Sequence, residues 1–185
     1  MRIIAGVAGG RLVTAPPAGT RPTTDRVRES LFAMLETRMD LDGVRVLDLY
    51  AGSGALALEA VSRGAGHATL VDSDAKAVAV IRANARIVGA GPDVVTVVRR
   101  RADAFLQAAA GDPFDLVFCD PPYDLPAEVV DGHAARLVEN GWLAPRATVV
   151  VERSARSPAT TWPDGLYGDG DRRYGDTRVE FALLA

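Results

Sequence analysis

From residue 44 onward the chain alternates short apolar runs with alanine-rich stretches of helical spacing, and no other feature constrains the fold as strongly. The apolar runs predict strands over residues 44–49, 68–71, 94–98, 115–119 and 148–151. The stretches between them predict helices over residues 54–63, 75–88, 102–109 and 127–140. Runs such as VLDL and LVFC do not alternate with polar residues, as expected when helices cover both faces of a parallel sheet. The pattern therefore predicts an α/β fold built from repeated strand–helix–strand units.

The two ends of the chain follow other patterns. Residues 2–5 and 11–14 are short runs separated by Gly9-Gly10, which predicts a small hairpin, and a proline-rich link (APPAGTRP) follows it. Thr24 is expected to cap a helix that ends near Arg38. Residues 166–174 and 177–184 flank Gly175-Asp176 and predict a terminal antiparallel hairpin. We therefore divide the chain into an N-terminal extension, residues 1–38, and a main domain, residues 39–185.

Composition narrows the class of protein. The chain has 185 residues, enough to bury a sizeable core in one domain. Its single cysteine, Cys119, excludes an intramolecular disulfide, and no Cys/His cluster has the spacing of metal ligands. No apolar stretch is long enough for a signal sequence or a membrane span. We expect a cytoplasmic protein that needs no metal and no membrane.

Charge is distributed unevenly along the chain. The overall net charge is −3, but the first 28 residues carry about +4 and the rest about −7. The basic end holds five arginines: Arg2, Arg11, Arg21, Arg26 and Arg28. Clustered arginines can contact the phosphates of a nucleic acid, although they can equally be solvated surface charges. The asymmetry favours the first interpretation and predicts an RNA-binding extension.

A glycine-rich turn, LDLYAGSGALALEA, follows the first predicted strand. Gly52 and Gly54 let the backbone approach a ligand closely, and Ala51 lies in the same turn. With Ala57 the turn also satisfies the dinucleotide fingerprint G-x-G-x-x-G/A. Asp48, at the end of the strand, would repel a pyrophosphate but attract a cationic amino acid. These residues therefore favour S-adenosylmethionine over NAD.

Acidic residues follow the next two predicted strands. Asp72, about twenty residues past the glycines, can accept hydrogen bonds from a ribose diol, and Ser73 is beside it. Asp103 can accept from an adenine amino group, with Ala104 next to it. Aspartates after strands can also be plain helix caps. Three acids in register, Asp48 included, favour an adenosine pocket.

The strongest single motif is DLVFCDPPY, in which an apolar strand runs directly into Asp120-Pro121-Pro122-Tyr123. An exocyclic amine of a nucleobase is a weak nucleophile because its lone pair is delocalised into the ring. Asp120 and the Pro121 carbonyl can each accept one N–H and so localise that lone pair. Pro122 helps to hold the backbone, and Tyr123 offers a face on which the base can stack. Cys119 could serve as a nucleophile, but its place in the apolar run favours a buried core thiol.

Taken together, RIIAG, RPTTDRVRESLF, VLDLYAGSGALALEAVSRGA, DLVFCDPPY and YGDT resemble the RsmD family of bacterial 16S rRNA guanine-N2 methyltransferases over nearly the whole chain. The resemblance implies a Rossmann-like class I fold dependent on S-adenosylmethionine, with a seven-stranded, mostly parallel sheet and an N-terminal β-hairpin extension. It implies methylation of the guanine at position 966 of 16S rRNA within the small ribosomal subunit, by an enzyme that we expect to be a monomer. One departure is that GVAGG carries one basic residue fewer than the family pattern between RIIAG and the next strand.

Three other functions compete with this prediction. A purely RNA-binding module would need the basic N-terminal hairpin but not the cofactor pocket. A DNA adenine-N6 methyltransferase would share the DPPY motif, but the chain leaves little room for a target-recognition domain. An NAD-dependent oxidoreductase would share only the glycine turn, and it leaves Asp48 and the DPPY motif unexplained. The sequence therefore favours an amino-methyltransferase.

Overall fold

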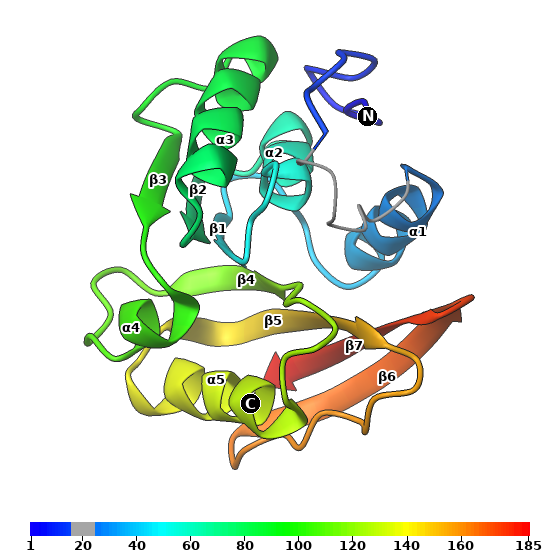
Figure 1. Cartoon of the computed structure of the whole chain (residues 1–185), viewed down its shortest axis with the longest axis vertical. Helices are drawn as coiled ribbons and strands as arrows, with labels where there is room; N and C mark the ends of the chain where they lie inside the picture. The colour runs from blue at the N-terminus through cyan, green and yellow to red at the C-terminus, as the bar shows by residue number, and fades with distance from the viewer. Residues whose placement is uncertain (16–24) are drawn as a thin grey trace.

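A computed structural model of the chain describes residues 1–15 and 25–185 (Figure 1). The helices are α1 (Asp25–Glu36), α2 (Ala55–Ser62), α3 (Ala75–Val88), α4 (Ala102–Leu106) and α5 (Ala127–Glu139). The strands are β1 (Arg45–Leu49), β2 (His67–Asp72), β3 (Val95–Arg99), β4 (Phe114–Cys119), β5 (Leu143–Ser154), β6 (Leu166–Tyr174) and β7 (Thr177–Leu184). Arg21, the Thr24 cap and the proline-rich link from Pro16 on lie outside the described residues.

The strands form one seven-stranded sheet in the order β3-β2-β1-β4-β5-β7-β6. The first five strands along the chain run parallel to one another, whereas β7 is antiparallel to both β5 and β6. This confirms the predicted mostly parallel sheet with a terminal antiparallel hairpin. The strand order reverses between β1 and β4, and in open α/β sheets ligands bind at the carboxyl ends of the strands that flank such a switch point.

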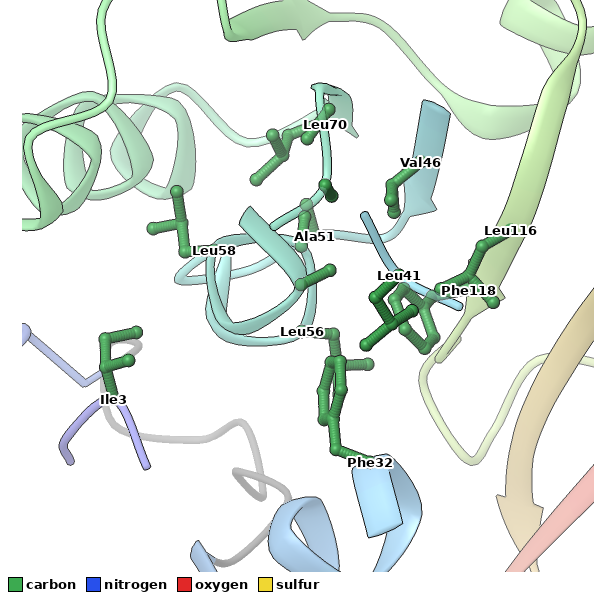
Figure 2. Packing of buried hydrophobic residues seen from close by; sticks show 14 of the residues in the cluster. Ile3, Phe32, Leu41, Val46, Ala51, Leu56, Leu58, Leu70, Leu116 and Phe118 are labelled. Carbon is green, nitrogen blue, oxygen red and sulfur yellow. The ribbon is translucent and has the colours of Figure 1, made fainter. Parts of the chain in front are cut away.

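Both faces of the sheet are buried along the central strands β2, β1, β4 and β5, as the unbroken apolar runs predict. Helices α1, α2 and α3 lie on one side of the sheet, and α4 and α5 lie on the other (Figure 1). Successive residues of β1 alternate between the two hydrophobic clusters on these sides: Val46 belongs to the cluster with α1, α2 and α3, and Leu47 belongs to the cluster with α4 and α5. In the first cluster Phe32 of α1 contacts Phe118 of β4, with ring centroids 5.9 Å apart (Figure 2). Helix α1, which carries Arg26 and Arg28, is thereby fixed against the main sheet.

Strand β5 is longer than predicted, and an irregularity explains why. Its register against β4 shifts between Phe114 and Leu116, and Arg146 adopts a left-handed φ of 63°. Because Pro145 and Arg146 interrupt the apolar run and the polar residues 152–154 follow it, the sequence revealed only residues 148–151 of the strand. Helix α4 ends at Leu106, three residues before the predicted end.

The N-terminal hairpin is shorter than predicted. Its two segments run antiparallel, but Arg2 and Leu12 form only an isolated bridge. The reason is that the backbone N–H groups of Ile4 and Ala5 donate to the side chain of Glu59 in α2 and not to the facing segment. Ile3, Ala8 and Val13 belong to the same hydrophobic cluster as the main sheet, so the extension and the main domain share a core. No helix in the described ranges has the length and apolarity needed to cross a membrane.

Candidate active site

The carboxyl ends of the five parallel strands lie level with one another. The last core residues are paired in one row: Val98, Val71, Leu49, Cys119 and Val151. The residues that follow this row along their strands form a polar edge: Arg99, Asp72, Tyr50, Asp120 and Glu152. The sheet therefore brings the predicted cofactor acid Asp72 and the predicted catalytic acid Asp120 to the same edge, on either side of β1.

The glycine turn is held in place by its own backbone and by Asp72. The Gly52 N–H donates to Asp72 Oδ2 (2.8 Å), and the Gly54 N–H donates to the Ala51 carbonyl (2.7 Å). Both glycines have a left-handed φ, 58° and 79°. A Cβ on Gly52 would meet only the Tyr50 carbonyl, 3.9 Å away, among the described atoms, whereas one on Gly54 would lie 2.9 Å from a Leu70 methyl. Gly52 thus faces open space and Gly54 faces the core, so the turn has room for a ligand on the Gly52 side.

Asp48 is a buried acid beneath this turn. Its Oδ2 accepts the Ala57 N–H in the first turn of α2 (3.2 Å). Burial raises the pKa of Asp48 to about 7, the Ala57 hydrogen bond opposes that rise, and the nearby charge of Asp72 adds to it. A cationic ligand would stabilise the ionised form of this buried carboxyl. The ammonium and sulfonium groups of S-adenosylmethionine are cations of this kind.

The third predicted cofactor acid, Asp103, lies at the start of α4. Its carboxylate forms a two-point ion pair with Arg101, each N–O distance 3.0 Å, and accepts the Ala104 N–H (2.8 Å). The Arg101 hydrogen bond holds the pKa of Asp103 at about 2. Ser73, next to Asp72, is exposed. A carboxylate has about four lone-pair sites, so Asp103 retains acceptor capacity for an adenine amine.

The Asp120-Pro121-Pro122-Tyr123 block leaves the end of β4 as a compact turn. Pro121 is buried and Pro122 exposed, and the Pro122 carbonyl accepts the Leu125 N–H (3.0 Å). The Tyr123 hydroxyl hydrogen-bonds the hydroxyl of Thr177 at the start of β7 (2.8 Å), while the side chain remains 37% exposed. The tyrosine is therefore anchored at its hydroxyl and still presents surface to a base.

Cys119, directly before this block, is a core residue. Its side chain is buried in the cluster shared with α5. Burial, reinforced by the charge of Asp120, raises the pKa of the Cys119 thiol well above its usual range. The sequence-based preference for a core thiol over a nucleophile is confirmed. Within the described ranges no three His, Cys, Asp or Glu side chains gather as a metal site would require.

Two residues at this edge escaped the sequence analysis. Tyr50 follows β1 with a left-handed φ of 64°, an uncommon conformation for a bulky residue and one often found at functional sites. Its hydroxyl hydrogen-bonds His133 Nε2 in α5 (2.6 Å), and the rings stack with centroids 5.8 Å apart. Burial lowers the pKa of His133, so the ring is neutral near pH 7. The sequence signal that could have identified Tyr50 is its position directly before the glycine turn, where a bulky residue in a left-handed conformation is unusual.

The predicted RNA-binding arginines have different surroundings. Arg2 and Arg26 are exposed, and Arg11 is exposed while it donates to the Ile87 carbonyl (2.8 Å). Arg28 is wholly buried: it is 3.0 Å from Asp25 Oδ1 and 3.7 Å from Glu59 Oε2. The prediction that Arg28 contacts RNA is therefore wrong, because an interior side chain between two carboxylates cannot reach a phosphate. Its spacing from Leu31, Phe32 and Leu35 along the buried stripe of α1 was the signal.

The strand order, the glycine turn after the first strand and the acids at the strand ends together define a Rossmann-like methyltransferase of class I. Residues 1–183 match the family model described as Conserved hypothetical protein 95. The chain is 40% identical over 166 residues to the ribosomal RNA small subunit methyltransferase D of Escherichia coli K12, covering 88% of this chain and 79% of that protein. The chain belongs to this family, the RsmD family.

Solved structures agree with this placement. One from Escherichia coli is 36% identical and superposes with a TM-score of 0.87, covering 100% of this chain and 97% of that one. A magnesium protoporphyrin IX methyltransferase of Synechocystis with bound S-adenosylmethionine is 20% identical, with a TM-score of 0.67 over 86% of this chain and 79% of its own. The second likeness shows the fold alone.

Proposed function

We propose that this protein transfers a methyl group from S-adenosylmethionine to the exocyclic N2 of a guanine in 16S rRNA, at position 966. The observation that carries the proposal is that the glycine turn follows β1 and Asp120 follows β4, and these two neighbouring strands flank the switch point. The relative from Escherichia coli is named as a methyltransferase of small-subunit ribosomal RNA, which supports the same substrate. We propose further that the protein acts as a monomer, in the cytoplasm, on the small ribosomal subunit.

The residues present fit the cofactor. Asp48, Ala51, Gly52, Gly54, Asp72, Ser73, Asp103 and Ala104 would hold it: the open side of Gly52 leaves room for it, and the buried Asp48 would pair with its positive charge. When bound, S-adenosylmethionine supplies an electrophilic methyl group on a sulfonium. Because Asp48 lies beneath the turn and Asp72 holds the Gly52 N–H, the two acids play separate parts, one electrostatic and one in shaping the turn.

The catalytic block would act on the base. Asp120 and the Pro121 carbonyl accept the two hydrogens of the target amine, so that its lone pair is directed out of the ring's conjugation. Tyr123, held by Thr177, would stack on the base, which is worth roughly 1–3 kcal/mol by comparison with other base–aromatic contacts. Correct placement of amine and methyl donor can supply about 7–11 kcal/mol of the barrier, so positioning carries most of the rate.

The test is methyl transfer by Asp120 variants. Asp120→Asn keeps an acceptor oxygen and should retain part of the rate, whereas Asp120→Ala should lose about ten- to a hundredfold, since hydrogen bonds to charged groups are worth about 1.5–3 kcal/mol. Both should bind S-adenosylmethionine nearly normally. The measurement is single-turnover transfer of labelled methyl to 16S rRNA or small subunits, with circular dichroism as the folding control. A folded Asp120→Ala that transfers methyl at the parental rate would rule out the DPPY block as the active site.

For RNA contact we propose Arg2, Arg11, Arg21 and Arg26. Phosphate contacts release counterions, so losing one arginine should weaken RNA binding and lower the salt dependence by about one ion per contact. Arg26→Ala provides the test and Arg82→Ala, in α3 and outside the extension, the matched control. An unchanged salt slope in Arg26→Ala would place the RNA surface elsewhere.

A further inference from the structure

Buried polar side chains dock the N-terminal segment, residues 1–15, on the helices that carry the cofactor turn. Glu59 of α2 accepts the N–H groups of Ile4 (2.8 Å) and Ala5 (3.0 Å). Ser62 accepts the Ala8 N–H at its hydroxyl (3.0 Å) and the Val7 N–H at its carbonyl (2.7 Å). Because the Glu59 and Ser62 side chains are buried, the docked position of the segment is defined by specific partners.

Asn84 of α3 extends this docking to the glycine turn. Its side chain is wholly buried, and its Oδ1 accepts the Thr14 N–H (2.8 Å). Its Nδ2 donates to the Thr14 carbonyl (3.0 Å) and to the Ser53 carbonyl (2.9 Å). Ser53 lies between Gly52 and Gly54. Only a primary amide of this length offers two donors and an acceptor, so one side chain joins the extension to the turn.

The Ser53–Gly54 peptide is therefore held at both ends. Its N–H donates to the Ala51 carbonyl (2.7 Å), and its carbonyl accepts from Asn84. Ser53 lies between Gly52 and Gly54, and both glycines have left-handed φ values. Because Gly52 has no side chain and faces open space among the described atoms, little side-chain packing fixes the turn there. The orientation of this peptide thus depends on Asn84, and the orientation of Asn84 depends on Thr14.

We propose that Asn84 is a positioning residue for the cofactor turn and that the N-terminal segment completes the S-adenosylmethionine site through it. The proposal rests on the cofactor turn of the proposed function. Since linkage is reciprocal, a bound cofactor also favours the docked segment, and the segment carries Arg2 and Arg11, two of the arginines proposed to contact RNA. Cofactor binding and RNA binding are then coupled across α2 and α3.

Two glycines of the segment provide a matched test. A Cβ on Gly6 would lie 1.7 Å from the Ser62 carbonyl oxygen, whereas one on Gly10 would meet no described atom within 4 Å. Their φ values are nearly equal, +78° and +83°, so both alanine variants carry a similar backbone penalty and only Gly6→Ala forces the segment off α2. Titration calorimetry on the full chain should show the Kd for S-adenosylmethionine raised about tenfold in Gly6→Ala, within the range of site–site couplings, and within about twofold of the parent in Gly10→Ala.

Asn84→Leu provides the second arm. Asn84→Leu should raise the Kd for S-adenosylmethionine by a similar factor. The double variant, Gly6→Ala with Asn84→Leu, should bind the cofactor no more weakly than either single variant, because both substitutions break the same connection between the N-terminal segment and the glycine turn. A parental Kd in Gly6→Ala would overturn the coupling. If Gly52→Ala binds S-adenosylmethionine weakly in that case, the assignment of the glycine turn as the cofactor site is retained and only the coupling is wrong. If Gly52→Ala also binds normally, the turn assignment itself fails.

Hydrogen exchange of the parent protein tests the proposal without any variant, and so covers the possibility that a variant unfolds. The Thr14 N–H donates to Asn84. Saturating S-adenosylmethionine should slow exchange of the Thr14 amide about fivefold or more, within the range of linkage effects. Unchanged exchange at Thr14, with slowed exchange in residues 50–54, would show that the cofactor orders only its own turn and would overturn the proposal.

Discussion

An alanine substitution at either glycine of the cofactor turn should have a different main effect: weaker cofactor binding at Gly52 and a lower melting temperature at Gly54. Gly52 and Gly54 both have a left-handed φ, which costs a residue with a Cβ roughly 1–2 kcal/mol. At Gly52 that is the main cost, because the nearest described atom is 3.9 Å from the added Cβ. At Gly54 the Cβ would lie 2.9 Å from Leu70 and 3.3 Å from Leu58 methyls, and such overpacking adds typically 1–3 kcal/mol.

These free energies convert to melting temperatures. For a protein of this size 1 kcal/mol shifts Tm by about 2–4 °C, so Gly52→Ala should lower Tm by about 4 °C and Gly54→Ala by about 10 °C. Cofactor binding should show the reverse order. The methyl of Gly52→Ala enters the space proposed for the ligand and should raise the Kd for S-adenosylmethionine at least tenfold, about 1.4 kcal/mol. The methyl of Gly54→Ala points into the core, so the folded variant should bind within about threefold of the parent.

The assay is thermal unfolding by circular dichroism together with titration calorimetry below the lower Tm. The reasoning would be refuted by a Gly52→Ala variant that binds S-adenosylmethionine as the parent does. It would equally be refuted by a Gly54→Ala variant that keeps its Tm but loses binding, since its Cβ would then face the ligand and not Leu70.

Two further predictions concern individual side chains. Because the Asp48 pKa is about 7 in the free protein and a cationic ligand favours the carboxylate, affinity for S-adenosylmethionine should be nearly full at about pH 8 and fall about tenfold from there to about pH 6. Asp48→Asn should bind weakly with no such dependence, and a parent affinity that is flat over this range would contradict the assignment. Tyr123→Phe and Thr177→Val should each slow single-turnover methyl transfer about fivefold, the worth of about 1 kcal/mol for one neutral hydrogen bond. The double variant should be no slower than either single one, and additive losses would mean that Thr177 does not act through Tyr123.

The sequence predicted structural features that depend only on the residues of a single helix or strand. The helix Ala75–Val88 and the strands Leu166–Tyr174 and Thr177–Leu184 have the predicted bounds, because an apolar stripe or a turn signal marks each locally. The carboxyl edge was also predictable: in a parallel sheet the residues that follow the strands reach the same edge, so Asp72 and Asp120 were expected at the edge that carries the glycine turn. Their places on either side of β1 follow from the strand order, which only the structure shows. The positions of the candidate site residues along the strands could therefore be predicted before the fold was known.

What only the tertiary structure decided is which distant groups pair. Arg28 stands in a basic segment, yet it is buried, with the buried Glu59 on one side and the partly exposed Asp25 on the other. Thr14 meets Asn84 across 70 residues of chain, and Tyr50 meets His133 across 83. Periodicity reports whether a residue faces the interior of its own element, but not what it meets there. A buried polar group needs a partner, and that partner is set by how helices and strands pack, which no local pattern records.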